Sequence, residues 1–143
     1  MPAPTPVLSD AIRVFLQQPH VASVATTDDD GSPRQAVVWY RLEPDDRILL
    51  NSRTPRRWCA NLVRDPRLAI SVIDAEDAYR WVGLTAVVEE VVDDVERARD
   101  DIVALARRYR PEGPTAASIA AFRSQPRVTF LARITGVHDH LED

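Results

Sequence analysis

The run from Ile48 to Asp74, ILLNSRTPRRWCANLVRDPRLAISVID, constrains the fold of this chain more than any other stretch. Its pattern predicts a strand over Ile48–Ser52, a short helix, and a second strand over Leu68–Ile73. Thr54 is a suitable helix cap. Pro55 suits the first helical position, because the N–H that proline lacks would have no partner there. The stretch therefore predicts a strand–helix–strand unit joined by tight turns.

The predicted helix has one apolar face, made by Trp58, Cys59, Leu62 and Val63. Spacing of this kind buries a helix against a core. Cys59 is the only cysteine, so an intrachain disulfide and a cysteine metal cluster are both excluded. We expect Cys59 to be a small buried hydrophobe, and Trp58 to belong to the core with it.

Three arginines, Arg53, Arg56 and Arg57, crowd the point where the first strand gives way to this helix. A helix start exposes unpaired N–H groups and the positive end of the helix dipole, which attract anions. Guanidinium groups bind phosphate oxygens through two parallel hydrogen bonds. The cluster therefore predicts a site for a phosphorylated ligand, although successive helical residues turn by about 100° and cannot all face one ligand. The alternative is that these arginines are solvated or paired with acidic residues.

The rest of the sequence predicts strands joined by tight turns, with helices between some of them. An Asp-Gly turn within residues 28–33 favours an antiparallel hairpin. Ser9, the pair Asp93-Asp94, and Thr115 are predicted helix caps. We expect strands at His20–Thr27, Arg34–Leu42, Tyr79–Val92 and Arg127–His138, and helices at Asp10–Gln18, Val95–Tyr109 and Thr115–Phe122.

These elements define the expected fold class, which is α+β with mostly antiparallel β structure. A count of six strands and three to four peripheral helices fits a small split β-barrel, which avoids exposed sheet edges. The chain has neither a GxGxxG nor a GxxxxGKS/T motif, so a βαβ nucleotide fold is not expected. We expect one domain over residues 1–143, with a loose proline-rich segment at residues 1–8.

Charge limits the possible partners. The net charge is -4 and the pI is about 5.4, so the chain lacks the broad basic face that nucleic-acid binding needs. All 18 basic residues are arginine, which excludes Schiff-base chemistry on lysine and is typical of a GC-rich genome. The sequence shows no signal-peptide pattern and no apolar run of transmembrane length. We therefore expect a cytoplasmic protein that binds a small anion and contacts no membrane.

Three segments together resemble a known family: GSPRQAVVWY (Gly31–Tyr40), the run Ile48–Asp74, and AYRWVGLTAVVEEV (Ala78–Val91). In this order they are similar to the pyridoxamine 5′-phosphate oxidase-like superfamily of flavin-binding split barrels. NLVRDPR (Asn61–Arg67) is the most specific part, and the resemblance runs from about Ser9 to Asp139. The short length and the actinobacterial-looking composition resemble the deazaflavin-dependent branch, whose cofactor is coenzyme F-420.

This resemblance implies a homodimer with two cofactor sites in clefts between the subunits. Arg57 matches the basic residue, commonly lysine in the family, that grips the cofactor phosphate. Asn51, Ser52 and Arg53 match the strand end that lines the phosphate and ribityl region. Arg56 and Arg64 are further basic groups for the oligoglutamyl-lactyl tail of the deazaflavin.

The resemblance also implies contacts to the tricyclic ring of the cofactor. One strand, Val37, Val38 and Trp39, matches the backbone edge that runs along the ring. A second segment matches one that approaches the ring from the partner subunit: Tyr79, Arg80 and Trp81. The ending RITGVHDHLED has no match to the substrate-holding residues of the pyridoxamine phosphate oxidases, so vitamin B6 chemistry is not expected.

The implied activity is hydride transfer between coenzyme F-420 and an electron-poor conjugated small molecule, such as an enone, a quinone or a bilin. The cofactor carries this chemistry, so the sequence needs no catalytic dyad, and no catalytic residue is assigned. Two alternatives stay open. One is an FMN-dependent oxidoreductase of the same fold. The other is a non-enzymatic flavin-, haem- or pigment-binding module, for which His20 is the only internal histidine.

His138 and His140 lie two residues apart on a predicted strand, so both side chains point to one side. Acidic residues follow them, which makes a metal site conceivable. A solvated chain end is the favoured interpretation, and we expect no metal.

Overall fold

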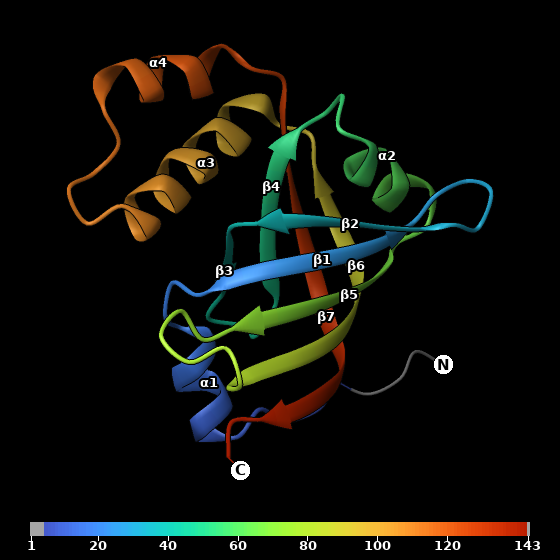
Figure 1. Ribbon diagram of the computed structural model, residues 1–143. Coiled ribbons are helices and arrows are strands. Elements are labelled where there is room, and N and C mark those ends of the chain that lie inside the picture. The colour runs from blue at the N-terminus through green and yellow to red at the C-terminus, as the bar shows by residue number, and fades with distance from the viewer. Residues whose placement is uncertain (1–4, 143) are drawn as a thin grey trace.

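Over residues 5–142, the computed structural model is a curled sheet of seven strands with four helices around it (Figure 1). The sheet order is β2-β1-β5-β6-β7-β4-β3, and all neighbours pair antiparallel. The strands are β1 Val21–Thr27, β2 Pro33–Val38, β3 Tyr40–Leu42, β4 Ile48–Arg53, β5 Arg67–Ile73, β6 Trp81–Val92 and β7 Arg127–His140. The helices are α1 Asp10–Leu16, α2 Arg57–Arg64, α3 Val95–Tyr109 and α4 Ala116–Ser124.

The expected α+β class with an antiparallel sheet is confirmed, but the expected count of six strands is wrong. The predicted strand Arg34–Leu42 is interrupted at Trp39, so that β2 pairs with β1 whereas β3 pairs with β4. β2 and β3 are the two edges of the sheet. Because one residue separates them, chain continuity brings the edges together and makes the sheet curl.

Tyr40 fixes this corner to the first helix. Its side chain is fully buried, and its hydroxyl donates to the carbonyl oxygens of Leu16 at 2.9 Å and Gln18 at 3.0 Å. The predicted start of that helix is confirmed, because the Ser9 hydroxyl accepts from the Ile12 N–H at 3.2 Å. Residues 1–4 of the segment that we expected to be loose lie outside the described residues, and Leu8 is buried against the core.

The predicted start of α2 is wrong. Thr54 and Pro55 form a turn, in which the Thr54 N–H donates to the Pro126 carbonyl at 3.0 Å, and Arg56 occupies the cap position without a side-chain hydrogen bond. The predicted apolar face needs one correction as well, because Val63 is 67% exposed and the buried polar residue Asn61 takes its place. The turn pairs with the start of β7, a contact that local sequence does not encode.

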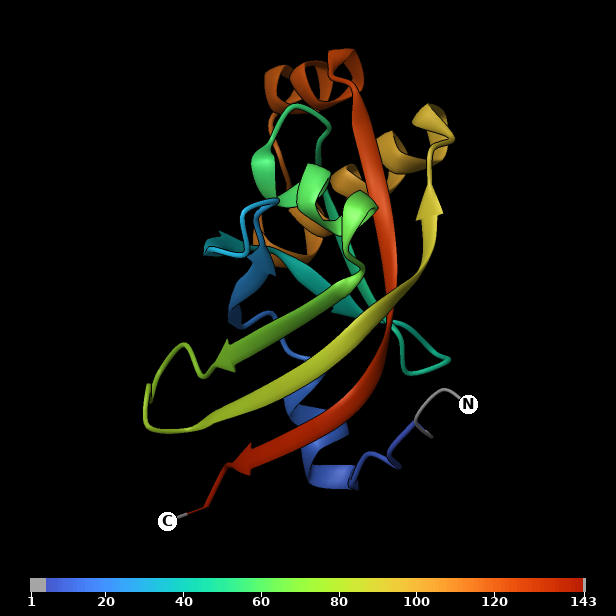
Figure 2. The same ribbon diagram turned by 90° about the vertical axis from the view of Figure 1, so that its right-hand side faces the viewer.

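The helices gather at two ends of the molecule. α2, α3 and α4 lie at one end, whereas α1 and the C-terminus lie at the other (Figures 1 and 2). The caps of α3 and α4 are those predicted: Asp94 accepts from two helical N–H groups, and Thr115 accepts from the Ser118 N–H. Among residues 5–142, no helix is both long and apolar enough to cross a membrane.

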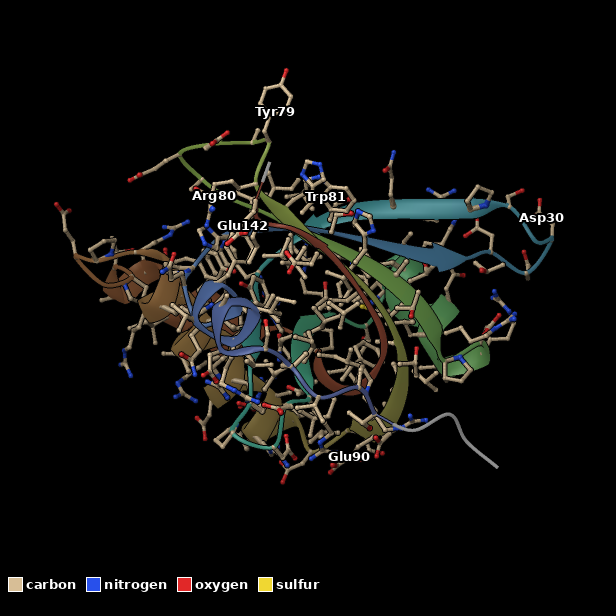
Figure 3. All side chains as sticks on the ribbon, turned by 90° about the horizontal axis from the view of Figure 1, so that it is seen from below. Asp30, Tyr79, Arg80, Trp81, Glu90 and Glu142 are labelled. Atoms are coloured by element: carbon tan, nitrogen blue, oxygen red, sulfur yellow. The ribbon has the colours of Figure 1, made fainter. Side chains whose placement is uncertain are left out.

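Side chains alternate across the strands, as period-2 burial requires. On β1 and β5, Ala22, Val24, Ile70 and Val72 point inward and are at most 2% exposed. Seen from below, the strands wrap around an interior filled with side chains (Figure 3). The core therefore lies inside the curl.

Candidate functional site

A cleft of about 310 Å³ lies where the ends of β2 and β4 meet α2, α3, α4 and the start of β7. We call it the arginine cleft. It brings together six residues expected at the cofactor, namely Val37, Val38, Trp39, Asn51, Ser52 and Arg56. Five further residues complete the lining: Trp58, Ile102, Arg110, Phe122 and Arg127.

The arginine cleft is positively charged and lacks a counter-charge. Its lining holds the guanidinium groups of Arg56, Arg110 and Arg127, and no acidic side chain of residues 5–142 belongs to it. Arg56 and Arg110 are exposed, and their guanidinium groups make no hydrogen bond or ion pair with any described residue. The chain has more acidic residues, 22, than arginines, 18, so unpaired arginines in one place call for an explanation.

Arg127 is the buried member of this group. It is 7% exposed, and its polar partners are neutral: Nε and Nη2 both donate to Gln125 Oε1, and Nη1 donates to Asn51 Oδ1 at 3.4 Å. Its guanidinium carbon also lies 5.3 Å from the centroid of the Phe122 ring. The sheet register places Arg127 directly opposite Arg53. Burial, together with the nearby charges of Arg56 and Arg53, lowers the pKa of Arg127 to about 10. The structure thus holds a desolvated cation without an anion.

Two buried polar atoms in the cleft lining also lack partners. Among the described residues, neither Ser52 Oγ nor Trp58 Nε1 has a hydrogen-bond partner, although their residues are 1% and 4% exposed. The buried Cys59 thiol lies near the Ser52 hydroxyl but is not hydrogen-bonded to it. Burial raises the pKa of the Cys59 thiol to about 11. Buried polar atoms are normally satisfied, so these two donors fit a ligand that brings acceptor atoms.

Asn51 holds this arrangement in place. Its side-chain Nδ2 donates to the Ala98 carbonyl at 2.8 Å and to the Thr129 hydroxyl at 2.9 Å, which links β4 to α3 and β7. The Thr129 hydroxyl in turn donates to Asp101 at 2.8 Å. Asn51, which accepts from Arg127, therefore positions that arginine and has little hydrogen-bonding capacity left for a ligand.

Arg57 lies in a different environment. With Arg64 it lines a separate hollow beside the β1–β2 turn, which we call the acidic hollow because the turn contributes Asp28, Asp29 and Asp30. Arg57 Nη1 is 3.8 Å from Asp28 Oδ2, and its side chain is 64% exposed. Arg57 is thus not in the lining of the arginine cleft, and its predicted grip on a phosphate stays a prediction.

The remaining predicted site residues do not join the cleft of their own chain. Arg53 is exposed at the end of β4. Tyr79, Arg80 and Trp81 lie at the start of β6, at the end of the molecule that carries α1 (Figures 1 and 3). Tyr79 is 80% exposed, and Arg80 pairs with Asp74 at 3.3 Å.

The histidines lie outside the arginine cleft. His138 and His140 point to one side of β7, as expected, and stack with Trp81 at centroid distances of 4.9 and 5.5 Å. His20 is buried, stacks on Phe15 at 4.2 Å, and accepts from the Ala75 N–H through Nδ1. Within residues 5–142, no three His, Cys, Asp or Glu side chains are grouped to hold a metal ion.

Sequence reasoning missed Ile102, Arg110, Phe122 and Arg127. Ile102 lies in α3, Arg110 directly follows α3, and Phe122 lies in α4. Local sequence does not predict that these helices pack at the cleft. Arg127 follows Pro126 at the start of the last predicted strand, and only the pairing of β4 with β7 brings it beside Arg53 and the cleft. A correct pairing of these two strands would have been enough to find it.

A family model described as pyridoxamine 5′-phosphate oxidase matches residues 8–138 of this chain. Among curated proteins, a biliverdin reductase of Mycobacterium tuberculosis (strain CDC 1551 / Oshkosh) that depends on reduced coenzyme F-420 is 30% identical over 107 residues. That match covers 75% of this chain and 76% of the relative.

Solved structures show the same fold. An F-420 reductase superposes with a TM-score of 0.76 at 25% identity, covering 92% of this chain and 98% of that one. A haem-storage protein of Vibrio cholerae gives a TM-score of 0.69 at 20% identity, covering 92% and 94% of the two chains. The second likeness shows the fold alone.

Proposed function

The chain belongs to the pyridoxamine 5′-phosphate oxidase family, and we propose that it is an oxidoreductase that uses coenzyme F-420, bound in the arginine cleft. Its substrate would be an electron-poor conjugated small molecule. The names of two relatives, a biliverdin reductase that depends on reduced coenzyme F-420 and an F-420 reductase, support the deazaflavin over other flavins.

One observation carries the proposal: a desolvated, unneutralised Arg127 faces a cleft whose lining also contains two unsatisfied donors. Leaving a buried donor such as Ser52 Oγ or Trp58 Nε1 unpaired costs about 1–3 kcal/mol, and a ligand with acceptor atoms recovers this cost when it binds. A phosphate diester satisfies this set, because it is anionic and offers several acceptor oxygens. The residues present therefore fit the phosphorylated part of the cofactor.

This chain's residues would divide the work of binding. Arg56 and Arg127 hold the phosphate, and Ser52 donates to it. Val37, Val38 and Trp39 form an apolar wall for the ring and keep water from it. When bound, the deazaflavin supplies hydride chemistry, and the protein supplies position and electrostatics.

We also propose that the protein works as a homodimer. Five neighbouring strands share an outward face that no helix covers in Figure 1. Apart from Arg67 at one end of β5, its residues are uncharged, in a chain with 28% charged residues. The uncharged residues are Gln35, Val37, Val21, Ser23, Ala25, Ala69, Ser71, Ile73, Trp81, Gly83, Thr85, Gly136, His138 and His140. Flat uncharged faces of this extent are typical of subunit interfaces.

A dimer through this face would give the segment Tyr79–Trp81 a role that it lacks within one chain, since it could reach the partner's cleft. Substituting Ala69→Arg, in the middle of the face, should yield a monomer, whereas Val63→Arg, an exposed apolar position on α2, should leave the dimer intact. Light scattering after size exclusion distinguishes the two masses. A monomeric unsubstituted protein would refute the dimer.

The function is tested by titrating the cofactor-free protein with coenzyme F-420 and with FMN, following ring and tryptophan fluorescence. We expect tight binding of coenzyme F-420, weaker binding of FMN, and loss of both in Arg127→Met. Preferred binding of FMN would identify a flavin oxidoreductase of the same fold. Binding of neither would refute an oxidoreductase that uses either cofactor.

A haem-binding module is the less favoured alternative. No histidine of residues 5–142 lines the arginine cleft, and the buried His20, whose Nε2 has no hydrogen-bond partner among the described residues, lies outside it. The haem-storage protein resembles this chain in fold at 20% identity, which carries no information about its ligand here.

A further inference from the structure

We propose that Arg110 and Trp39 form a second anion-binding pole of the arginine cleft, which recognises a carboxylate on the electron acceptor. The inference rests on the proposed function and adds a substrate class to it: conjugated acceptors that carry an acidic side group.

Arg110 is an unpaired cation held over an aromatic ring. It follows the last residue of α3, and its guanidinium carbon is 5.6 Å from the centroid of the Trp39 ring. This is its one side-chain interaction with the described residues. Trp39 in turn stacks on Tyr109 at 5.3 Å with an interplanar angle of 9°, which makes the support rigid. A guanidinium held in this way keeps its donors free for an oxyanion.

A favourable helix dipole does not by itself account for this position. Basic residues are common at helix C-termini because the dipole is negative there. The last turn of α3 already carries Arg107 and Arg108. Arg108 donates to carbonyl oxygens of residues 16, 17, 18 and 40, so it stabilises the fold. Arg110 makes no such bond and lines the cleft instead.

The second pole starts from the opposite end of α3 from the first. Asn51, the partner of Arg127, donates to the Ala98 carbonyl in the first turn of α3, whereas Arg110 lies beyond the last turn. Twelve residues at 1.5 Å each separate positions 98 and 110 by about 18 Å along the helix axis. Arg53 and Arg56 are the arginines whose charges lower the pKa of Arg127, and Arg110 is not among them. The cleft therefore has two cationic poles joined by an apolar wall.

The chemistry of the cofactor suggests which anion each pole takes. In coenzyme F-420 the phosphate and the oligoglutamyl tail lie on one side of the ribityl chain, and the ring lies on the other. A phosphate at Arg56 and Arg127 directs the ring along Val37–Trp39, toward Arg110. The phosphate and the carboxylates of the cofactor then lie away from Arg110, so a carboxylate at Arg110 must come from the molecule that meets the ring. A single guanidinium matches a carboxylate through two parallel hydrogen bonds.

The test uses a matched pair of probes, biliverdin and its dimethyl ester, which differ in two propionate charges. Each is titrated into protein saturated with oxidised coenzyme F-420, so that no hydride donor is present and binding is read alone by fluorescence quenching. We expect the diacid to bind more tightly than the ester. Arg110→Gln should weaken binding of the diacid by about 10- to 100-fold, which is typical of a lost charged hydrogen bond, and change the ester by less than about twofold.

Arg107→Gln is the control, because Arg107 is exposed in the same helical turn and is absent from the cleft lining. It should change neither probe. Weakened binding of coenzyme F-420 itself in Arg110→Gln would overturn the proposal by making Arg110 a cofactor contact. Equal binding of diacid and ester, or binding of neither, would also overturn it. If the unsubstituted protein fails to bind coenzyme F-420, the proposed function fails, and the same comparison on cofactor-free protein then decides the Arg110 proposal.

Discussion

The arginine cleft and the acidic hollow begin with neighbouring residues, Arg56 and Arg57, yet they differ in charge. In the hollow, Arg57 shares its surroundings with three aspartates of the β1–β2 turn. Asp28 there accepts from Arg34 and from Asn61, and these bonds hold its pKa below the usual value. In the cleft, no described carboxylate lies among the lining residues.

This difference shows that an acidic partner, and not the position of an arginine in the sequence, decides whether the arginine is available to a ligand. The hollow has satisfied its charges internally, so a further anion would gain little there. The cleft leaves the buried charge of Arg127 without a counter-ion and two buried donors without partners, which is a cost to the free protein. Unsatisfied buried groups of this kind are typical of a site where a ligand satisfies them. We therefore assign ligand binding to the arginine cleft and a structural role to the acidic hollow.

The largest effect on this difference between the two regions is expected for Arg127→Met. Coenzyme F-420 should bind about 100-fold more weakly, as expected when a charged hydrogen bond is lost. The cofactor-free variant should nevertheless unfold at a higher temperature, since exchanging a buried unpaired ion for an apolar side chain of similar volume gains about 1–3 kcal/mol. Titration calorimetry and thermal unfolding check both signs. A variant that binds normally and is less stable would contradict the account.

Through Arg127, the stability of the free protein should also depend on pH. Arg127 has a folded-state pKa lowered to about 10, below its unfolded value, so the unfolded chain holds this proton more tightly. The destabilisation is therefore fully present at neutral pH and relieved as the pH rises above about 10. Bound phosphate should raise the pKa again.

The opposite outcome is expected in the hollow for Asn61→Ala. Asn61 is 2% exposed, and its Nδ2 donates to the Thr26 hydroxyl at 3.0 Å and to Asp28 at 2.8 Å. Removing it leaves buried acceptors unpaired and should cost about 1–3 kcal/mol of unfolding free energy. Urea denaturation measures this loss, and affinity for coenzyme F-420 should be unchanged. A large loss of affinity in a folded variant would give the hollow a direct role in binding.

Arg56→Ala and Arg57→Ala form a matched pair across the boundary between the two regions. We expect Arg56→Ala to weaken cofactor binding by about tenfold, because the ligand loses its contact with the guanidinium group of Arg56. Arg57→Ala should change it by less than about threefold, because Asp28 already screens that charge. The reverse order would restore Arg57 as the phosphate ligand, as the family resemblance implies.

The smallest effect is expected for Ser52→Ala. Its hydroxyl has no hydrogen-bond partner among the described residues, so its removal should change the stability of the free protein by less than about 0.5 kcal/mol. Cofactor affinity should fall by about two- to fivefold, the value of one neutral hydrogen bond. A stability loss without an affinity loss would mean that Ser52 is only structural.

Local patterns in the sequence predicted most of the fold. Val95–Tyr109 and the caps at Ser9, Asp94 and Thr115 follow from helical periodicity and from side chains that accept backbone N–H groups. The break at Trp39 was not predictable in this way, because the residues on both sides favour strands. It arises from the pairing of β2 and β3 with different partners.

The candidate site was predicted only in part for a similar reason. Ser52 and Arg56 were found because they lie in one contiguous motif. Arg127 and Arg110 were missed because they reach the cleft through strand register and helix packing, which involve residues more than 50 positions away. The sequence also placed Arg57 beside Arg56 without indicating that the turn at Asp28 would supply a counter-charge.

The most direct test of this account is a crystal structure of the protein with oxidised coenzyme F-420 bound. We predict that the phosphate oxygens lie within about 3 Å of the guanidinium nitrogens of Arg56 and Arg127, with the Ser52 hydroxyl donating to one of them. A phosphate bound instead against Arg57, with Arg127 still unpaired, would contradict the central claim that the unneutralised arginines mark the cofactor site.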